Sequence, residues 1–484
     1  MSGFVSLLGA GPGDVELITV KGARRLREAD VLVYDRLVNK DLFSYLSDKC
    51  QLIDVGKKPG MPCIRQEEIE KILIEKAKEN KRVVRLKSGD PYIFGRGGEE
   101  AQSLVEAGIL FEIVPGVTSA IAGATYAGIP MTFRDKATSF HVFTGHLQDE
   151  MESLNWAAIS QLKGTLVFLM GMKHLSVITQ ELVNNGFSKD TPVAIVEWAT
   201  HPSQRSIDGT LSIIEELALK EEMKAPSIIV VGDVVSFRKE LNFYEHLPLY
   251  GKRIFLQDSA TGKLPAYLKD DGATLVKFPS RTQVNKLSFD LPDWSQVDGM
   301  VVADTQSWSL FLSRLREDGI DLRSLAHIQF AAIGHHTAKT LEESGILLVA
   351  KGTQSKDPVI LDLLTNAEGT WYGVAPEHKV EELQNLYDFP LLVTHSLGFD
   401  KEVSPEDWTN LDCVCLPNSV AAANFVALVD ETGLDIQELP IIVMGETTRD
   451  KLVEAGYSRI IETDQPTILA IRDKCRDILI KENL

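Results

Sequence analysis

The sequence is short of the features that mark membrane, secreted or fibrous proteins. Its 484 residues include only five cysteines and no Cys-x-x-Cys pair, so we expect neither a disulfide framework nor a zinc ribbon. The apolar runs, such as 165–170 and 228–231, are far shorter than the roughly 20 residues that cross a bilayer. No basic segment precedes an apolar one at the start of the chain, so we expect no secretory signal and a cytoplasmic location.

Positive charge is also scarce. Lys and Arg number 50 against 69 Asp and Glu, which gives a net charge of −19, and most of this excess lies in residues 251–484. Such a field disfavours nucleic acid and anionic membranes, so we expect neither as a partner. An anionic substrate would therefore be held by local groups of Arg and Lys.

The first half of the chain alternates strand and helix patterns. This alternation predicts a mostly parallel α/β sheet covered on both faces, with ligands at the carboxyl ends of the strands. Gly, Pro and Asp gather at those ends. The predicted strands are 4–8, 31–34, 83–86, 110–114, 165–170, 192–196 and 227–231, and helical spacing covers 19–29 and 66–79.

The second half begins after residues 236–253, which interrupt the alternation and are predicted to be a connector. It contains a faint repeat, because Gly334 and Thr337 recur as Gly445 and Thr448, each pair 111 positions apart. Two similar α/β lobes with a ligand between them are the favoured interpretation. A chance likeness of two strand–turn–helix units is the alternative.

The first turn, Gly9-x-Gly11-x-Gly13, is similar to a dinucleotide fingerprint but departs from it. The third glycine comes one residue early, and Pro12 removes a backbone N–H that a pyrophosphate would use. The loop alone therefore favours a structural turn over a dinucleotide site.

Several motifs in a fixed order change this interpretation. They are Gly9–Thr19, Val33–Val38, Val55-Gly-Lys57, Val84–Glu100, Val114–Ala120, Tyr126–Arg134 and Thr144-Gly-His146. With these motifs, residues 1–245 resemble the uroporphyrinogen-III C-methyltransferases of the tetrapyrrole methylase class. Residues 251–484 resemble uroporphyrinogen-III synthase more weakly, through the repeat, Gly251-Lys-Arg before a strand, and the two Gly-x-x-Thr turns. The expected fold class is α/β, with a two-lobed methylase domain followed by a two-lobed synthase-like domain.

The resemblance implies S-adenosylmethionine as methyl donor, S-adenosylhomocysteine as product, and a homodimer formed through the methylase half. Such a donor needs close backbone approach, which glycine turns permit, and an apolar slot around the sulfur. No metal is expected. The donor contacts that the resemblance implies are Pro12, Ser88, Gly89, Asp90, Ile93, Thr118, Ser119, Met170 and Ala199; taken alone, Ser88–Pro91 is an ordinary turn and Met170 a core residue.

The implied reaction methylates C2 and C7 of uroporphyrinogen III to give precorrin-2, a step towards siroheme or cobalamin. The carboxylate arms of this substrate call for Arg, and the resemblance points to Arg96 and Arg134, with Arg36 as a weaker candidate. Asp35 matches the acidic position that accepts a proton, and Lys57 matches a proton donor. Glu99 is expected to orient Arg96 or to bind pyrrole N–H groups.

The second half is expected to convert hydroxymethylbilane to uroporphyrinogen III by cyclisation and ring inversion. Asp304–Ser307 and Pro417–Ser419 occupy turns where this family is rich in Ser and Thr. Thr337 and Thr448 are cleft candidates or, alternatively, helix caps, and His335-His336 is taken as a solvated turn. Three alternatives stay open: an inactive, binding-only second half, a methylase acting on another precorrin, and a sensor of small molecules.

Overall fold

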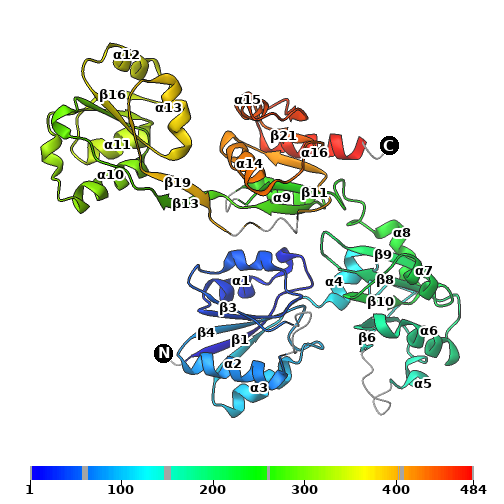
Figure 1. The fold of residues 1–484 in the computed structure, drawn as a ribbon. Coiled ribbons are helices and arrows are strands. Elements are labelled where there is room, and N and C mark those ends of the chain that lie inside the picture. Colours follow the sequence, from blue (N-terminus) through cyan, green and yellow to red (C-terminus); the bar gives the residue numbers. More distant parts are fainter. Residues whose placement is uncertain are drawn as a thin grey trace. The chain divides into compact units, whose positions relative to one another are not determined.

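The computed structural model describes residues 3–56, 64–145, 154–258, 262–401, 403 and 408–481. The chain divides into two compact units (Figure 1). The first comprises Met1–Arg253, Lys263–Leu275 and Arg472–Leu484, and the second comprises Ile254–Gly262 and Val276–Ile471. None of the helices in the described part of the chain has the length and apolar character needed to cross a membrane.

The first lobe of the first unit is a five-stranded parallel sheet in the order β3-β2-β4-β1-β5. Helix α1 covers one face, and α2 and α3 cover the other (Figure 1), because each presents apolar side chains at helical spacing to the strands. The elements are β1 (Phe4–Gly9), the 3-10 helix η1 (Val15–Leu17), α1 (Val20–Arg27), β2 (Val31–Tyr34), η2 (Lys40–Tyr45), β3 (Gln51–Asp54), α2 (Gln66–Lys78), β4 (Arg82–Lys87), α3 (Gly97–Glu106) and β5 (Leu110–Val114).

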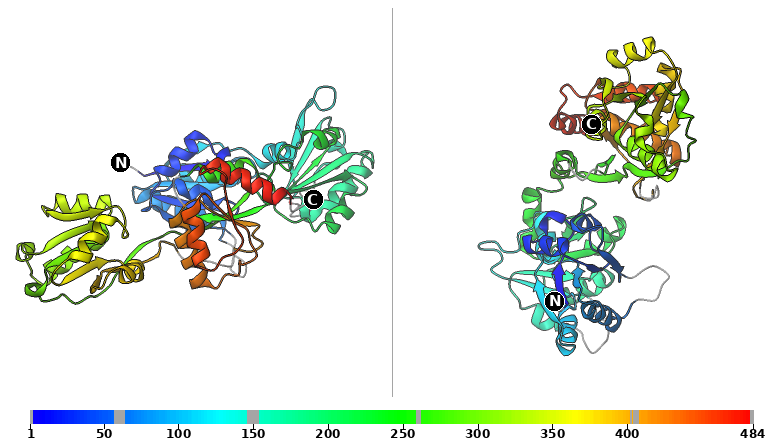
Figure 2. Two further views of the ribbon diagram at one scale, coloured as in Figure 1. Left: turned by 90° about the horizontal axis from the view of Figure 1, so that it is seen from above. Right: turned by 90° about the vertical axis from the view of Figure 1, so that its left-hand side faces the viewer.

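The second lobe of this unit has a mixed sheet in the order β6-β7-β10-β8-β9. Its strands are the cyan and green arrows at the right of the left panel of Figure 2. Strand β10 runs antiparallel to β7 and β8, and β8 runs antiparallel to β9. The prediction of a mostly parallel sheet is therefore right for the first lobe and wrong for this one. Only residues 198–204 separate β8 from β9, which is shorter than the crossover of a dozen residues that parallel neighbours need.

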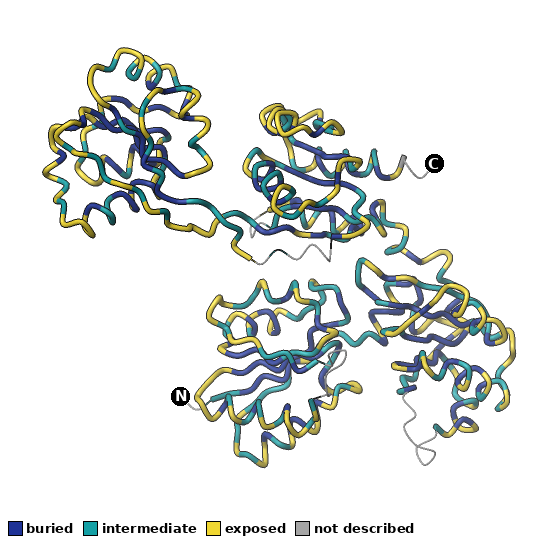
Figure 3. The backbone as a smooth tube through the Cα atoms, in the orientation of Figure 1, coloured by how far each residue is buried: buried dark blue, intermediate teal, exposed yellow. Residues whose placement is uncertain are grey.

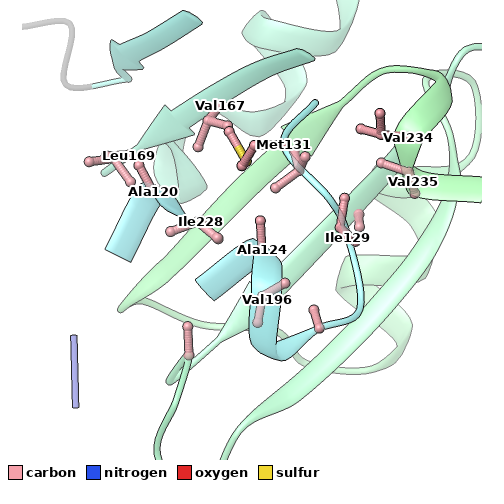
Figure 4. Packing of buried hydrophobic residues seen from close by; sticks show 14 of the residues in the cluster. Ala120, Ala124, Ile129, Met131, Val167, Leu169, Val196, Ile228, Val234 and Val235 are labelled. Atoms are coloured by element: carbon pink, nitrogen blue, oxygen red, sulfur yellow. The ribbon is translucent and has the colours of Figure 1, made fainter. Parts of the chain in front are cut away.

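Helix α4 packs its small residues on this mixed sheet. Ala120 and Ala124 lie against Val167, Val196 and Ile228 in one buried cluster (Figure 4). Small side chains let the helix approach closely, so its first turn lies beside the strand ends. The elements of this lobe are α4 (Ser119–Tyr126), β6 (Phe140–Thr144), α5 (Trp156–Ile159), β7 (Thr165–Leu169), η4 (Met172–His174), α6 (Leu175–Asn184), β8 (Pro192–Glu197), β9 (Arg205–Thr210), α7 (Ile214–Lys220), β10 (Ser227–Val231), η5 (Asp233–Phe237) and α8 (Arg238–Leu241).

The remaining strands form two further five-stranded sheets, in the orders β12-β11-β20-β21-β22 and β16-β15-β14-β17-β18, and a two-stranded link, β13-β19. The expected pair of α/β lobes is confirmed. The repeat also has a structural counterpart, because Gly334 stands between β15 and α11 as Gly445 stands between β21 and α15.

The sheet β16-β15-β14-β17-β18 is parallel throughout. Its central strands β15, β14 and β17 are mostly buried, whereas the helices and the edge strand β16 carry exposed residues (Figure 3). Helices α10 and α11 lie on one face, and α12 and α13 lie on the other. The carboxyl ends of β14, β17 and β18 therefore lie side by side. The elements after residue 250 are listed here: β11 (Arg253–Gln257), α9 (Lys263–Asp270), β12 (Thr274–Phe278), β13 (Arg281–Lys286), η6 (Trp294–Gln296), β14 (Gly299–Val302), α10 (Thr305–Glu317), η7 (Leu322–Leu325), β15 (Gln329–Ile333), α11 (His335–Glu343), β16 (Leu348–Gly352), α12 (Pro358–Asn366), β17 (Trp371–Ala375), η8 (Glu377–Lys379), α13 (Val380–Leu386), β18 (Leu391–Val393), β19 (His395–Phe399), β20 (Cys413–Leu416), α14 (Ser419–Thr432), β21 (Ile441–Val443), α15 (Glu446–Glu454), β22 (Ile460–Glu462) and α16 (Ile468–Lys481).

Candidate functional site

Three glycines at the carboxyl ends of β1, β4 and β5 meet backbone to backbone. A Cβ atom on Gly116 would lie 2.2 Å from the carbonyl oxygen of Gly89, and one on Gly9 would lie 2.5 Å from the same oxygen. Gly11 and Gly89 exchange two backbone hydrogen bonds of 3.2 and 2.7 Å, and both have positive φ angles. Because no side chain fits here, the three turns form a cradle whose surface is backbone N–H and C=O.

Asp90 holds two of these turns together. Its carboxylate accepts hydrogen bonds from the backbone N–H of Tyr92 at 2.8 Å and of Gly116 at 3.0 Å. These bonds tie the turn after β4 to the turn after β5. The Asp90 carboxylate is thus bonded within the protein, and the prediction that residues 88–90 contact the donor stays a prediction.

Among the other predicted donor contacts, Thr118 and Ser119 lie at the start of α4, close to Gly89. A Cβ on Gly89 would lie 3.8 Å from Cα of Thr118 and 3.9 Å from the backbone nitrogen of Ser119. Met170 follows β7 with a φ of 57°, and its side chain is 52% exposed. Ala199 lies in the β8–β9 turn against Gly123 of α4, since a Cβ on that glycine would come within 2.9 Å of it. Ile93 is 44% exposed, on the loop beyond Asp90.

The turn that contains Pro12 reaches the second lobe through residues that sequence reasoning missed. The backbone N–H of Asp14 donates to Thr200 Oγ1 at 3.0 Å, and the Tyr126 hydroxyl donates to Asp14 Oδ2 at 2.7 Å. Burial raises the pKa of Tyr126, and Asp14 raises it further. These bonds fasten the first turn to α4 and to the β8–β9 turn.

This cradle fits a zwitterionic nucleoside with a sulfonium centre. A Cβ on Gly9 or Gly116 would collide with the backbone of Gly89, so only glycine lets these three turns pack against one another at the strand ends. Strained backbone at Met170, Trp198 and Thr200, all non-glycine residues with positive φ, lies at the adjacent strand ends. Such strain persists only where the surroundings determine it, and it gathers at ligand sites.

The predicted base, Asp35, is held by a buried network of charges. Its Oδ1 accepts from Arg85 Nη2 at 2.7 Å. Arg85 Nε donates to Glu100 Oε1 at 3.1 Å, and Lys87 Nζ donates to the same oxygen at 2.8 Å. Arg85, Lys87 and Glu100 are 2%, 4% and 0% exposed, whereas the Asp35 side chain is 33% exposed. One carboxylate of the network thus reaches the surface of the sheet edge.

The network shifts the pKa values of its two basic groups, Arg85 and Lys87, in opposite directions. Burial alone lowers the pKa of Arg85, but Asp35 and Glu100 outweigh it and raise the pKa above its ordinary value. Burial lowers the pKa of Lys87, and the charge of Arg85 lowers it further. The fixed charge beside Asp35 is therefore the guanidinium. The sequence signal for this network is the pattern Arg-Val-Val-Arg-Leu-Lys, in which charges interrupt a central strand.

The predicted substrate residues lie on exposed loops. Arg96 begins α3 with a left-handed φ of 57°, and its Nη2 lies 2.5 Å from Glu99 Oε2. This hydrogen bond lowers the pKa of Glu99. Arg134 is exposed at the tip of a turn that Phe133 and Ala137 close through two backbone hydrogen bonds of 2.9 Å. Glu99 is thus ion-paired with Arg96, and its two expected roles stay predictions.

Two further predicted residues need separate mention. Lys57 lies outside the described residues. Arg36 is exposed, and its backbone nitrogen would lie 2.6 Å from a Cβ on Gly56, so these two turns pack closely.

In the second half, the predicted Thr residues are buried. Thr337 and Thr448 are 4% and 5% exposed. The alternative that they cap helices is wrong, because the N-cap positions of α11 and α15 are Gly334 and Gly445. Asp304 and Asn418 do cap α10 and α14 through their side chains. His335 and His336 are both exposed.

Comparison with known proteins defines the class. Residues 5–215 match the family "Tetrapyrrole (Corrin/Porphyrin) Methylases", and the chain belongs to this family. Membership confirms the expected enzyme class and methyl donor.

Relatives extend this likeness beyond the first half. A uroporphyrinogen-III C-methyltransferase of Bacillus subtilis is 33% identical over 479 residues, which cover 96% of each chain. The porphyrin biosynthesis protein HemD of Ruminiclostridium josui is 41% identical over 353 residues, covering 71% of this chain and 70% of that protein. A uroporphyrin-III C-methyl transferase of Thermus thermophilus, solved with S-adenyl homocysteine, is 38% identical and covers 48% of this chain and 99% of its own, with a TM-score of 0.42.

Proposed function

We propose that residues 1–245 transfer methyl groups from S-adenosylmethionine to C2 and C7 of uroporphyrinogen III, giving precorrin-2. We further propose that residues 251–484 make that substrate from hydroxymethylbilane by cyclisation and ring inversion. The observation that carries the first activity is the side-chain-free cradle where Gly9, Gly89 and Gly116 meet. Relatedness over 96% of the chain supports extending the assignment to the second half.

In this proposal the methyl donor, S-adenosylmethionine, contacts backbone groups of the turns that follow the strands. The turn of Pro12, the segment Ser88–Asp90 and the start of α4 at Thr118 and Ser119 surround the nucleoside, while Ile93, Met170 and Ala199 supply apolar contacts. S-adenosylmethionine, when bound, supplies a methyl group that the sulfonium has already activated. Positioning and the exclusion of water then contribute most of the rate.

Arg96 and Arg134 bind the carboxylate arms of the macrocycle. A guanidinium pairs with a carboxylate through two parallel hydrogen bonds. Arg96 reaches the substrate already oriented by Glu99, which lies 2.5 Å away.

The Asp35 carboxylate acts on the positive charge that forms on the substrate. Attack by a pyrrole carbon on the methyl group leaves a cationic ring that must lose a proton. The Asp35 carboxylate steadies this cation and accepts the proton, and Lys57 serves as a proton donor. Arg85 fixes one oxygen of Asp35 at 2.7 Å, so the other oxygen is directed to the substrate.

The wider setting is also proposed. The chain acts in the cytoplasm as a homodimer formed through the methylase half. Its partners are the two tetrapyrrole substrates, and neither nucleic acid nor a membrane is among them.

One assay separates this function from its rivals. Purified chain is incubated with uroporphyrinogen III and methyl-labelled S-adenosylmethionine, and the product is analysed by mass. Two labelled methyl groups in the macrocycle support the proposal. Binding of the donor without transfer supports a sensor, and transfer only to a later precorrin supports a different methylase.

A parallel incubation with hydroxymethylbilane tests the second half. Type III product formed faster than the spontaneous type I isomer supports the synthase activity. Type I product alone indicates an inactive second half.

A further inference from the structure

A buried chain of hydrogen bonds crosses the second unit at the carboxyl ends of β14 and β18. Ser307 Oγ donates to Asp304 Oδ2 at 2.7 Å, and Thr394 Oγ1 donates to Ser307 Oγ at 3.0 Å. Thr394 Oγ1 also lies 2.9 Å from His395 Nδ1. Ser307, Thr394 and His395 are 0%, 1% and 2% exposed. The contacts thus join a carboxylate to an imidazole through two hydroxyl groups.

The direction of this chain follows from counting protons. A carboxylate only accepts, so Ser307 gives its single hydroxyl proton to Asp304. The oxygen of Ser307 then accepts a hydrogen bond from the hydroxyl group of Thr394. Thr394 Oγ1 also lies 3.4 Å from the carbonyl oxygen of Ala375, a second acceptor for the same proton. With its proton given to Ser307 or to this carbonyl, Thr394 has only lone pairs left for His395, and we infer that the Nδ1 atom of His395 carries the hydrogen. In the neutral imidazole the lone pair therefore lies on Nε2.

The surroundings keep this imidazole neutral. Burial lowers the pKa of His395, and only Asp304 opposes the change. A second histidine, His378, lies in η8, which follows the neighbouring strand β17, and burial lowers its pKa as well. Next to it, Lys379 Nζ donates to the carbonyl oxygen of Ala303 at 2.8 Å.

We propose that this strand edge is a binding site in which Nε2 of His395 accepts a hydrogen bond from a pyrrole N–H of a linear tetrapyrrole. The assignment rests on the proposed function of the second half and names a residue for it. A pyrrole N–H only donates, so it matches a fixed acceptor, whereas a carboxylate arm does not. Thr394, Ser307 and Asp304 are positioning residues that act through His395. In parallel sheets, ligands bind at such carboxyl edges.

The test uses the full chain, with hydroxymethylbilane as the probe. His395→Phe keeps a ring of similar size and removes the acceptor, and we expect kcat/KM for cyclisation to fall about tenfold or more. His395→Gln keeps an amide oxygen near the position of Nε2 and should recover part of this loss. The matched control is His336→Gln, which changes an exposed histidine of α11.

Two readouts separate ligand binding from folding. Methyl transfer to supplied uroporphyrinogen III belongs to the first half, so it should stay unchanged in every variant. Thr394→Val keeps the side-chain shape but frees the tautomer. Nitrogen-15 spectra of labelled histidine should then show the Nδ1 hydrogen of His395 in the parent chain and its partial loss in this variant.

The outcomes distinguish the two proposals. If the parent chain gives no type III product, the proposed function of the second half is wrong. If the parent chain is active and His395→Phe keeps its kcat/KM, the binding role of His395 is wrong. A spectrum with the hydrogen of His395 on Nε2 also overturns the inference, since that atom would then donate.

Discussion

The candidate sites of the two units occupy similar places and are built from different groups. Each lies at the carboxyl edge of a parallel sheet. In the first, Arg85 and Lys87 face Asp35 and Glu100 with direct ion pairs of 2.7, 3.1 and 2.8 Å. In the second, one carboxylate reaches His395 only through two neutral hydroxyl groups.

The difference matches the chemistry proposed for each half. Methyl transfer from a sulfonium to a pyrrole carbon places positive charge on the substrate, and a fixed carboxylate offsets it. Recognition of a pyrrole N–H needs one acceptor of known direction and no net charge. The ionic network of the first site sets the electrostatic potential around Asp35. The hydroxyl chain of the second site sets which nitrogen of His395 accepts a hydrogen bond.

The largest effect is expected when the buried guanidinium of Arg85 is removed from the first site. Arg85→Met leaves Glu100, which is 0% exposed, without one of its two cationic partners. We expect unfolding free energy to fall by about 3–5 kcal/mol and methyl transfer to be lost. Denaturant unfolding and the labelled-methyl assay measure the two effects. The control is Arg24→Met on the exposed side of α1; equal stability of the two variants would contradict the ionic description.

Asp35→Asn separates charge from shape. The amide oxygen still accepts from Arg85, so the fold should persist, but the carboxylate that offsets substrate charge is gone. We expect kcat for methylation to fall by about 10²–10⁴-fold, with affinity for S-adenosylhomocysteine unchanged by calorimetry. Asp48→Asn, at an exposed position, is the matched control. A kcat within twofold of the parent chain would remove Asp35 from the chemistry.

The glycine cradle is tested by adding one methyl group. In Gly116→Ala the new Cβ meets the Gly89 carbonyl oxygen at 2.2 Å, so the turns must move apart. We expect affinity for S-adenosylhomocysteine to fall about 100-fold, roughly 3 kcal/mol. In Gly98→Ala the Cβ meets nothing within 4 Å, so affinity should be unchanged and the helix slightly more stable. Equal affinities would show that donor binding does not depend on the close approach.

Acid should affect the two units in different pH ranges, through Glu112 of β5, which lies outside the candidate site, in the first unit and through His395 in the second. Burial raises the pKa of Glu112, but hydrogen bonds from Arg25, Lys21 and Ser6 outweigh this and lower it from 4.5 to about 2. This contact therefore stabilises fully above pH 4.5, by about 2 kcal/mol, and the stabilisation is lost as pH falls towards 2. The pKa of His395 is lowered from 6.5, so its contribution is lost as pH falls below 6.5.

The measurement is unfolding free energy against pH for Glu112→Gln and His395→Gln beside the parent chain. The stability difference for His395→Gln should change between pH 7 and 5, and that for Glu112→Gln should change only below pH 4.5. The reverse order would contradict both assignments.

The smallest effect is expected within the hydroxyl chain. Ser307→Ala removes one neutral link and should cost about 1 kcal/mol of unfolding free energy, with cyclisation lowered severalfold. Methyl transfer is the internal control. A loss as large as that of Arg85→Met would show that the second site depends on charge as much as the first.

Much of the fold was predictable because its signals are local. The strands at 31–34, 110–114 and 227–231 were predicted with the bounds the structure has, since each is a short apolar run ended by a turn residue. Strand β9 was missed, since its sequence Arg-Ser-Ile-Asp-Gly-Thr carries no apolar run. The antiparallel pairing around β10 was missed too, because pairing direction depends on connections between distant segments.

The candidate sites likewise contain features that the sequence predicts and contacts that it does not. The turns of Gly9, Gly89 and Gly116 are visible as glycines after strands, but their mutual contact is not, since 80 and 107 residues separate them from Gly9 along the chain. Asp90 was predicted as a donor contact, and that prediction stays untested; the bonds from its carboxylate to the backbone of Tyr92 and Gly116 could not be predicted from the sequence, because Gly116 is 26 positions away. The hydroxyl chain to His395 was not predicted, because Ser307 and Thr394 are 87 positions apart.

The sequence by itself determined where this chain turns, which strands are buried and to which family it belongs, since all three depend on the order and spacing of residue types. Only the tertiary structure decided which charges are neutralised, which carboxylate reaches the sheet edge and which hydroxyl groups connect Asp304 to His395. Those properties come from contacts between segments far apart in the chain, and the order of residue types does not specify which distant segments come into contact.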